Sequence, residues 1–259
     1  MRGRRRGWAA AAAAMLVLAP AGPAAAQLPG LLAEEGDGIA RFTLPLREEV
    51  RVCRNGFRTI GRSGDARIMT GRGGGSAACR EGVAVVEVTL RDGRVTGVDL
   101  LPEGRADARD LGRVSGPEAA AALLAVARAA PVRVAEDALV AAVVVDSVVV
   151  WPDLLELARN RTRPEDVRRS ALFWLGEEAA SVVTRELRAT AEDETEERGI
   201  REAAVFALSQ RSADESVPVL MELARTAPDP DTREQALFWL AQSDDPRVPG
   251  FFGALLRGP

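Results

Sequence analysis

The side chains that most often perform catalysis are scarce in this sequence of 259 residues. It contains no histidine and no tyrosine, which excludes a Ser-His-Asp triad, a Cys-His dyad and imidazole ligands for a metal. Carboxylates remain available, but no two of them occur in a context that would fix the spacing of a catalytic pair. We therefore predict no catalytic, cofactor-binding or metal-binding residues.

One aromatic residue recurs at a regular interval in the second half of the chain. The frame R-x-x-A-x-F-x-L occurs three times and contains Phe173, Phe206 and Phe238, which are 33 and 32 residues apart. A fixed period of this length is typical of stacked helical repeats, which hold an extended surface against another molecule. The recurring frame therefore indicates that the protein binds another molecule.

The three phenylalanines share an unusual position on their helices. With an advance of 100° per residue, each lies near the middle of a polar arc, far from the alanine of the same frame. The polar residues that border them are Arg169, Glu177, Glu202, Gln210, Glu234 and Gln242. Because an apolar patch with a polar rim marks an interaction site, we predict that this ridge binds a partner. The alternative is that each ring packs on the neighbouring helix, as we expect for Trp174 and Trp239.

Two charged features have structural interpretations that we favour over ligand binding. The arginines that open the three copies, Arg168, Arg201 and Arg233, lie close to the core-facing side, which favours a structural ladder over an anion site. The acidic run at residues 192–197 is interpreted as a solvated loop. Calcium binding is the alternative for this run, but the ordered D-x-D-x-D-G spacing is missing.

The N-terminal segment has the features of a secretory signal peptide. A basic stretch begins at Arg2, an apolar run follows, and three alanines at residues 24–26 suit a cleavage site. We predict a signal peptide at residues 1–26 and a flexible, Gly- and Pro-containing lead-in at residues 27–40. The expected location is periplasmic or secreted.

The charge balance argues against nucleic acid and anionic membranes as partners. The chain has 34 basic and 38 acidic residues, and four of the arginines belong to the predicted leader. An acidic exported protein is repelled by phosphate-rich surfaces. No stretch after the leader is long and apolar enough to span a membrane. The predicted partner is therefore another protein.

Residues 41–101 show the alternation and turn signals of a small antiparallel β module. Asn55-Gly56 and Asp92-Gly93 are two-residue hairpin turn signals. The second turn predicts a register in which Thr89 lies opposite Thr96. A linker with turn character follows at residues 102–116.

Both cysteines of the chain, Cys53 and Cys79, belong to this β module. Export would place them in an oxidising compartment, where an even pair most simply forms a disulfide. Free or redox-active thiols are the alternative.

From residue 117 to residue 257 the apolar spacing is helical. The repeat extends upstream to a degenerate copy centred on Ala138, and each copy follows a helix with an early proline, such as Pro152 or Pro218. The predicted fold is α-dominated (α+β), with an α-solenoid of about four helix pairs preceded by the β module.

The repeats resemble a known family in a specific pattern. Asp166-Val167-Arg168-x-x-Ala171 and Asp231-Thr232-Arg233-x-x-Ala236 are similar to short bacterial HEAT repeats of the phycobilin-lyase-like kind. The resemblance implies a curved scaffold for protein partners without general catalytic residues. The middle copy departs from the pattern, since Gly199 replaces the aspartate.

These observations predict a non-catalytic protein-binding scaffold or adaptor in the bacterial cell envelope. A regulatory or inhibitory subunit of an envelope protease or signalling complex would use the same surface. A carboxylate-dependent enzyme or lyase is the third hypothesis, and it would need a deep pocket with convergent acids.

Overall fold

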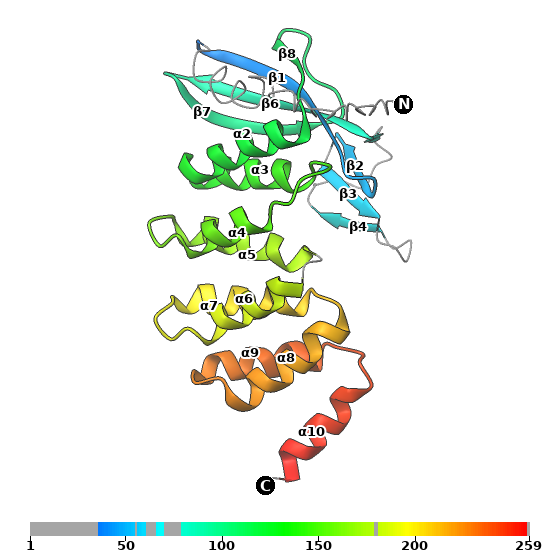
Figure 1. Ribbon diagram of the computed structural model, residues 1–259, viewed down its shortest axis with the longest axis vertical. Coiled ribbons are helices and arrows are strands. Elements are labelled where there is room, and N and C mark those ends of the chain that lie inside the picture. Colours follow the sequence, from blue (N-terminus) through cyan, green and yellow to red (C-terminus); the bar gives the residue numbers. More distant parts are fainter. Residues whose placement is uncertain (1–35, 55, 61–65, 70–78, 179–180, 258–259) are drawn as a thin grey trace, which may run out of the picture.

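The computed structural model describes residues 36–54, 56–60, 66–69, 79–178 and 181–257. The predicted signal peptide, most of the lead-in and Asn55 lie outside this part of the chain. The described elements stack in one direction, with one sheet at the end, a second sheet beside the first helices, and successive helix pairs below (Figure 1).

A four-stranded sheet forms the end of the stack. Its strands are β1 (Gly38–Pro45), β6 (Val83–Arg91), β7 (Arg94–Leu101) and β8 (Arg109–Arg113), in the order β7-β6-β1-β8. The strand pairings inside the predicted module are antiparallel, and β8, which lies outside its predicted bounds, pairs with β1 in parallel. The predicted linker at residues 102–116 therefore contributes a strand to the sheet. Its polar, glycine-containing sequence gave no local signal for that long-range pairing.

The second sheet lies beside the first helix pairs. It contains β2 (Val50–Cys53), β3 (Gly56–Ile60), β4 (Ala66–Met69) and β5 (Cys79–Glu81), in the order β4-β3-β2-β5, with every pairing antiparallel. Cys53 and Cys79 are direct partners across β2 and β5 and form the predicted disulfide, with Cα atoms 4.0 Å apart.

The β6–β7 hairpin has the predicted turn and a different register. Asp92 and Gly93 both have positive φ, as a type I′ turn requires. The register shifts between Leu90 and Thr89, so that Leu90 faces Val95 but Thr89 faces Gly97 and not Thr96. The prediction was wrong because a bulge inserts one residue into β7, which sequence alternation does not reveal.

Among the described residues the helices form four antiparallel pairs and a final helix (Figure 1). We term the first member of each pair an A helix and the second a B helix. The A helices are α2 (Gly116–Ala129), α4 (Trp151–Arg159), α6 (Ser181–Glu192) and α8 (Ala213–Thr226). The B helices are α3 (Val132–Val143), α5 (Glu165–Glu177), α7 (Arg198–Ser209) and α9 (Pro230–Ala241), and α10 (Arg247–Arg257) ends the chain. This arrangement confirms the predicted α-solenoid of about four helix pairs.

The first sheet and the helices share one hydrophobic core. Phe42 and Leu44 of β1 are fully buried in the same cluster as Leu123 of α2 and Leu139 of α3. A β-bridge between Leu46 and Val145 adds a backbone connection. The sheet is thus packed directly on the first helix pair, which compensates for the small core that so few strands can build.

The repeat alanines allow the B helices to approach one another closely. Ala138, Ala171, Ala204 and Ala236 are each completely buried. Gly176 extends this contact, since a Cβ atom there would lie 2.7 Å from the carbonyl oxygen of Ala207 on α7. Small residues at these points position each B helix against the next and so define one continuous face.

Candidate protein-binding face

The B helices form one face of the solenoid. α3 packs on α5, α5 on α7 and α7 on α9, so equivalent positions of successive repeats lie side by side. This face carries the phenylalanines of the recurring frame.

The aromatic side chains on this face touch in series. The rings of Phe173 and Phe206 stack with centroids 6.1 Å apart and an interplanar angle of 16°. The ring centroids of Phe206 and Trp239 are 5.0 Å apart, and those of Trp239 and Phe238 are also 5.0 Å apart. Phe173 also meets Trp174 edge-on. We term these five residues the aromatic row.

The rings of the row differ in exposure. Phe173, Phe206 and Trp239 are half-buried, because each leans towards a ring of the neighbouring repeat. Phe238 is 52% exposed, since no further B helix follows α9. Both sequence interpretations therefore describe part of the geometry: the rings pack between repeats and still present an edge or face to solvent.

A groove of about 530 Å³ runs across α3, α5, α7 and α9 above the aromatic row. Phe173, Phe206 and Trp239 form its apolar lining. The position two residues before each repeat alanine contributes Glu136, Arg169 and Glu202. The position directly before the alanine contributes Ser170, Ala203 and Gln235, and Asp166 completes the lining.

The groove contains acidic groups without ion-pair partners. Glu136 on α3 and Asp166 on α5 form no ion pair with any residue in the described part of the chain. Burial, followed by the negative charges of Asp166 and Asp137, raises the pKa of Glu136 above its usual range. Three carboxylates and one guanidinium, that of Arg169, line the groove; Glu202 pairs with Arg198 at 2.7 Å, which leaves Glu136 and Asp166 as its unpaired acids within the described residues.

The structure brings four of the predicted partner-binding residues into this groove. They are Phe173, Phe206, Arg169 and Glu202. Phe238 belongs to the aromatic row beyond the groove. Glu177, Gln210, Glu234 and Gln242 do not line it.

Sequence reasoning missed Glu136, Asp166 and Trp239 as lining residues. A signal for Glu136 was available, because it occupies in the first copy the place that Arg169 and Glu202 occupy in the next two. Asp166 lies in the same polar arc as Phe173 at 100° per residue. Trp239 was interpreted only as packing, and it both packs on Phe206 and lines the groove.

The opposite face, formed by the A helices, has ion pairs between consecutive helices. Ion pairs link consecutive A helices: Arg128 pairs with Asp153, Arg159 with Glu186 at 2.6 Å, and Arg188 with Glu222 at 2.7 Å. These pairs connect α2 to α4, α4 to α6 and α6 to α8. These A-helix charges are thus paired within the chain, whereas Glu136 and Asp166 on the B face pair with no residue of the described part.

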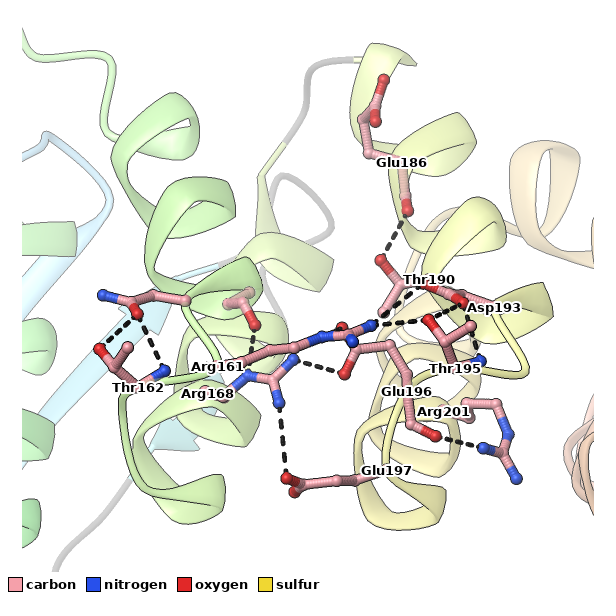
Figure 2. Close-up of polar contacts among 12 residues, drawn as sticks. Arg161, Thr162, Arg168, Glu186, Thr190, Asp193, Thr195, Glu196, Glu197 and Arg201 are labelled. Carbon is pink, nitrogen blue, oxygen red and sulfur yellow. Dashed lines mark hydrogen bonds and ion pairs between the residues drawn. The ribbon is translucent and has the colours of Figure 1, made fainter.

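The acidic run at residues 192–197 forms a connection between repeats and is not merely a solvated loop (Figure 2). Glu196 pairs with Arg168 at 2.6 Å and with Arg161 at 3.1 Å. The side chains of Arg168 and Glu196 are only 2% and 8% exposed. The prediction of a solvated loop was wrong for Glu196, because Arg168 of the preceding repeat provides a buried countercharge.

The recurring arginines bind turns, as the structural-ladder interpretation predicted. Arg168 donates from Nε to the carbonyl of Ala158 at 2.7 Å. Arg201 donates to the carbonyl of Glu196 and pairs with Asp229 at 3.4 Å. Arg233 donates to the carbonyl of Ala227 at 2.6 Å. These contacts hold helix–helix turns in place and occupy the arginines structurally.

The comparisons with known proteins agree with this geometry. Residues 151–248, from the start of α4 into α10, match the family model of HEAT repeats. The match supports a HEAT-repeat domain over this part of the chain, and such repeats generally serve as scaffolds for protein interaction. A search of curated proteins returns no match.

Two further properties concern ligands and membranes. Across the described residues, no group of three or more cysteine and acidic side chains is arranged to hold a metal ion. No helix in the described ranges is long and apolar enough to cross a bilayer.

Proposed function

We propose that this protein is a non-catalytic scaffold or adaptor that binds another protein through the face formed by its B helices. The observation that carries the proposal is the contrast between the two faces. Ion pairs link consecutive A helices, whereas the B face presents the aromatic row beside Glu136 and Asp166, two acids that pair with no residue in the described part of the chain. Half-exposed aromatic side chains are frequent anchors of protein interfaces.

The proposed place of action is the bacterial cell envelope. The basic and apolar leader at residues 1–26 would direct export, and the Cys53–Cys79 disulfide suits an oxidising compartment. We propose that the protein is periplasmic or secreted and that its partner is encountered there.

Capture of partners from an envelope extract tests this function. The bait is the protein purified from its exported form, beside the variant Phe206→Ser/Phe238→Ser. The matched control is Val149→Ser, which removes an apolar side chain that is 67% exposed outside the aromatic row. Thermal melting of each bait establishes that it is folded before capture.

We expect wild type and Val149→Ser to retain the same partner and the double variant to lose it. Exposed aromatic anchors contribute about 2 kcal/mol or more at interface centres, which weakens binding at least tenfold. Equal capture by the double variant would show that the partner binds elsewhere, and the proposed face would be wrong.

A further inference from the structure

We propose that the groove on the B face recognises an arginine or lysine side chain in an extended segment of the partner. This inference rests on the proposed function, because it specifies the chemistry of the partner at the same face.

The lining of the groove matches the two parts of such a side chain. Phe173, Phe206 and Trp239 provide half-buried aromatic surface, and a cation above an aromatic face is attracted by the ring quadrupole. Glu136, Asp166 and Glu202 provide carboxylates beside these rings. A long basic side chain combines an apolar stem with a cationic end, so it contacts both kinds of surface at once.

Charge complementarity favours a cation over a neutral apolar residue. Like charges at Glu136 and Asp166 repel each other, as the raised pKa of Glu136 reflects after the effect of burial. Neither group finds a countercharge within the described residues, although Glu202 on α7 pairs with Arg198 and ion pairs link the consecutive A helices. A guanidinium or ammonium group from a partner would relieve this repulsion.

The spacing of the rings favours an extended segment. Alternate residues of an extended chain are about 7 Å apart and point to the same side. The Phe173 and Phe206 centroids are 6.1 Å apart, and those of Phe206 and Trp239 are 5.0 Å apart. Side chains from one face of an extended peptide would thus meet successive repeats.

Replacing Arg169 tests the inference, because a groove with a purely structural role would not bind a basic segment more tightly after this change. Its guanidinium lines the groove, is exposed and pairs with no described residue. Its positive charge in the same groove would repel an incoming cation. Removing Arg169 should strengthen binding of a basic segment, whereas neutralising Glu136 and Asp166 should weaken it.

The experiment uses a displayed library of random dodecapeptides selected on the exported protein. Retained sequences are synthesised with a fluorophore, and their affinities are measured by fluorescence anisotropy at low and high salt. The variants are Glu136→Gln/Asp166→Asn, Arg169→Gln and Phe206→Ser. The matched control is Glu234→Gln, an exposed acid on α9 that does not line the groove.

We expect retained sequences to share an arginine or lysine flanked by apolar residues at alternate positions. Glu136→Gln/Asp166→Asn should weaken their binding about tenfold, and Arg169→Gln should strengthen it about threefold. Glu234→Gln should change it less than about twofold, and added salt should weaken wild-type binding.

Three results would overturn the inference. Basic sequences that bind Glu136→Gln/Asp166→Asn as tightly as wild type would show that the carboxylates play no part. Neutral or acidic sequences that depend on Phe206 would exclude a cation while leaving the proposed scaffold function intact. A library from which no sequence is retained would also overturn the inference, and the proposed function would then be judged by the envelope capture alone.

Discussion

Replacing Arg168 with methionine tests whether a buried ion pair joins neighbouring repeats. The side chain of Arg168 lies on α5 and binds both the Ala158 carbonyl and the Glu196 carboxylate. Methionine preserves most of the apolar stem and removes both donors. The variant would leave Glu196, which is 8% exposed, without its buried countercharge.

The expected loss follows from the surroundings of Glu196. Breaking a buried pair by removing one partner costs about 3–5 kcal/mol. Glu196 keeps its second ion pair, with Arg161 at 3.1 Å, so we expect the lower end, about 3 kcal/mol. In a chain of this length each kcal/mol lowers Tm by about 2–4 °C, which gives a decrease of about 6–12 °C.

Urea and thermal unfolding followed by far-UV circular dichroism measure this loss. The matched control is Arg161→Met, which removes the other partner of the same carboxylate from a side chain that is 54% exposed. The control should cost less than about 1 kcal/mol. Arg168→Met/Glu196→Gln should recover part of the loss, since no uncompensated charge remains. If Arg168→Met destabilises the protein no more than Arg161→Met, the ion pair does not join the repeats as described.

Four further predictions concern the core, the disulfide and pH. Ala204→Leu should cost about 1–3 kcal/mol by overpacking a fully buried contact, and an unchanged Tm would contradict the assigned packing. Gly176→Ala should lower Tm because its Cβ would crowd the Ala207 carbonyl, whereas Gly250→Ala, with open space around it, should not; equal effects would contradict this contact. Reducing the Cys53–Cys79 disulfide, which closes a loop of 26 residues, should cost about 3 kcal/mol in urea unfolding, and a stability independent of reductant would exclude this. Burial raises the pKa of Glu196, but hydrogen bonds and charges from Arg168 and Arg161 outweigh burial and lower it, so its contribution is present above about pH 4.3 and is lost as pH falls through the folded pKa. Glu196→Gln should therefore flatten the acid side of a plot of urea midpoint against pH, and an unaltered slope would contradict this assignment.

The solenoid could be predicted from the sequence because its determinants are local and repeated. A period of about 33 residues, alanines at one position and prolines early in the A helices define helix pairs without reference to distant parts of the chain. The disulfide was predictable for a similar reason, since the chain has only one pair of cysteines.

The errors occurred where a long-range contact overrides the local pattern. β8 is polar, and it becomes a strand because β1 offers it a parallel edge. The bulge at Thr96 of β7, opposite Thr89 and Leu90, shifts a register that the Asp92-Gly93 turn alone would set differently. Glu196 is buried because Arg168, 28 residues earlier, provides its countercharge.

The sequence by itself determined the type of repeat and the side of each helix that meets its neighbours. It also determined that aromatic residues recur beside polar ones on the B helices. Only the tertiary structure decided which of these residues share a groove. Glu136, Asp166 and Trp239 come from three different repeats, and the period does not specify how far each repeat rotates against the next. That rotation follows from packing between helices, so the charge and lining of the groove are properties of the assembled solenoid.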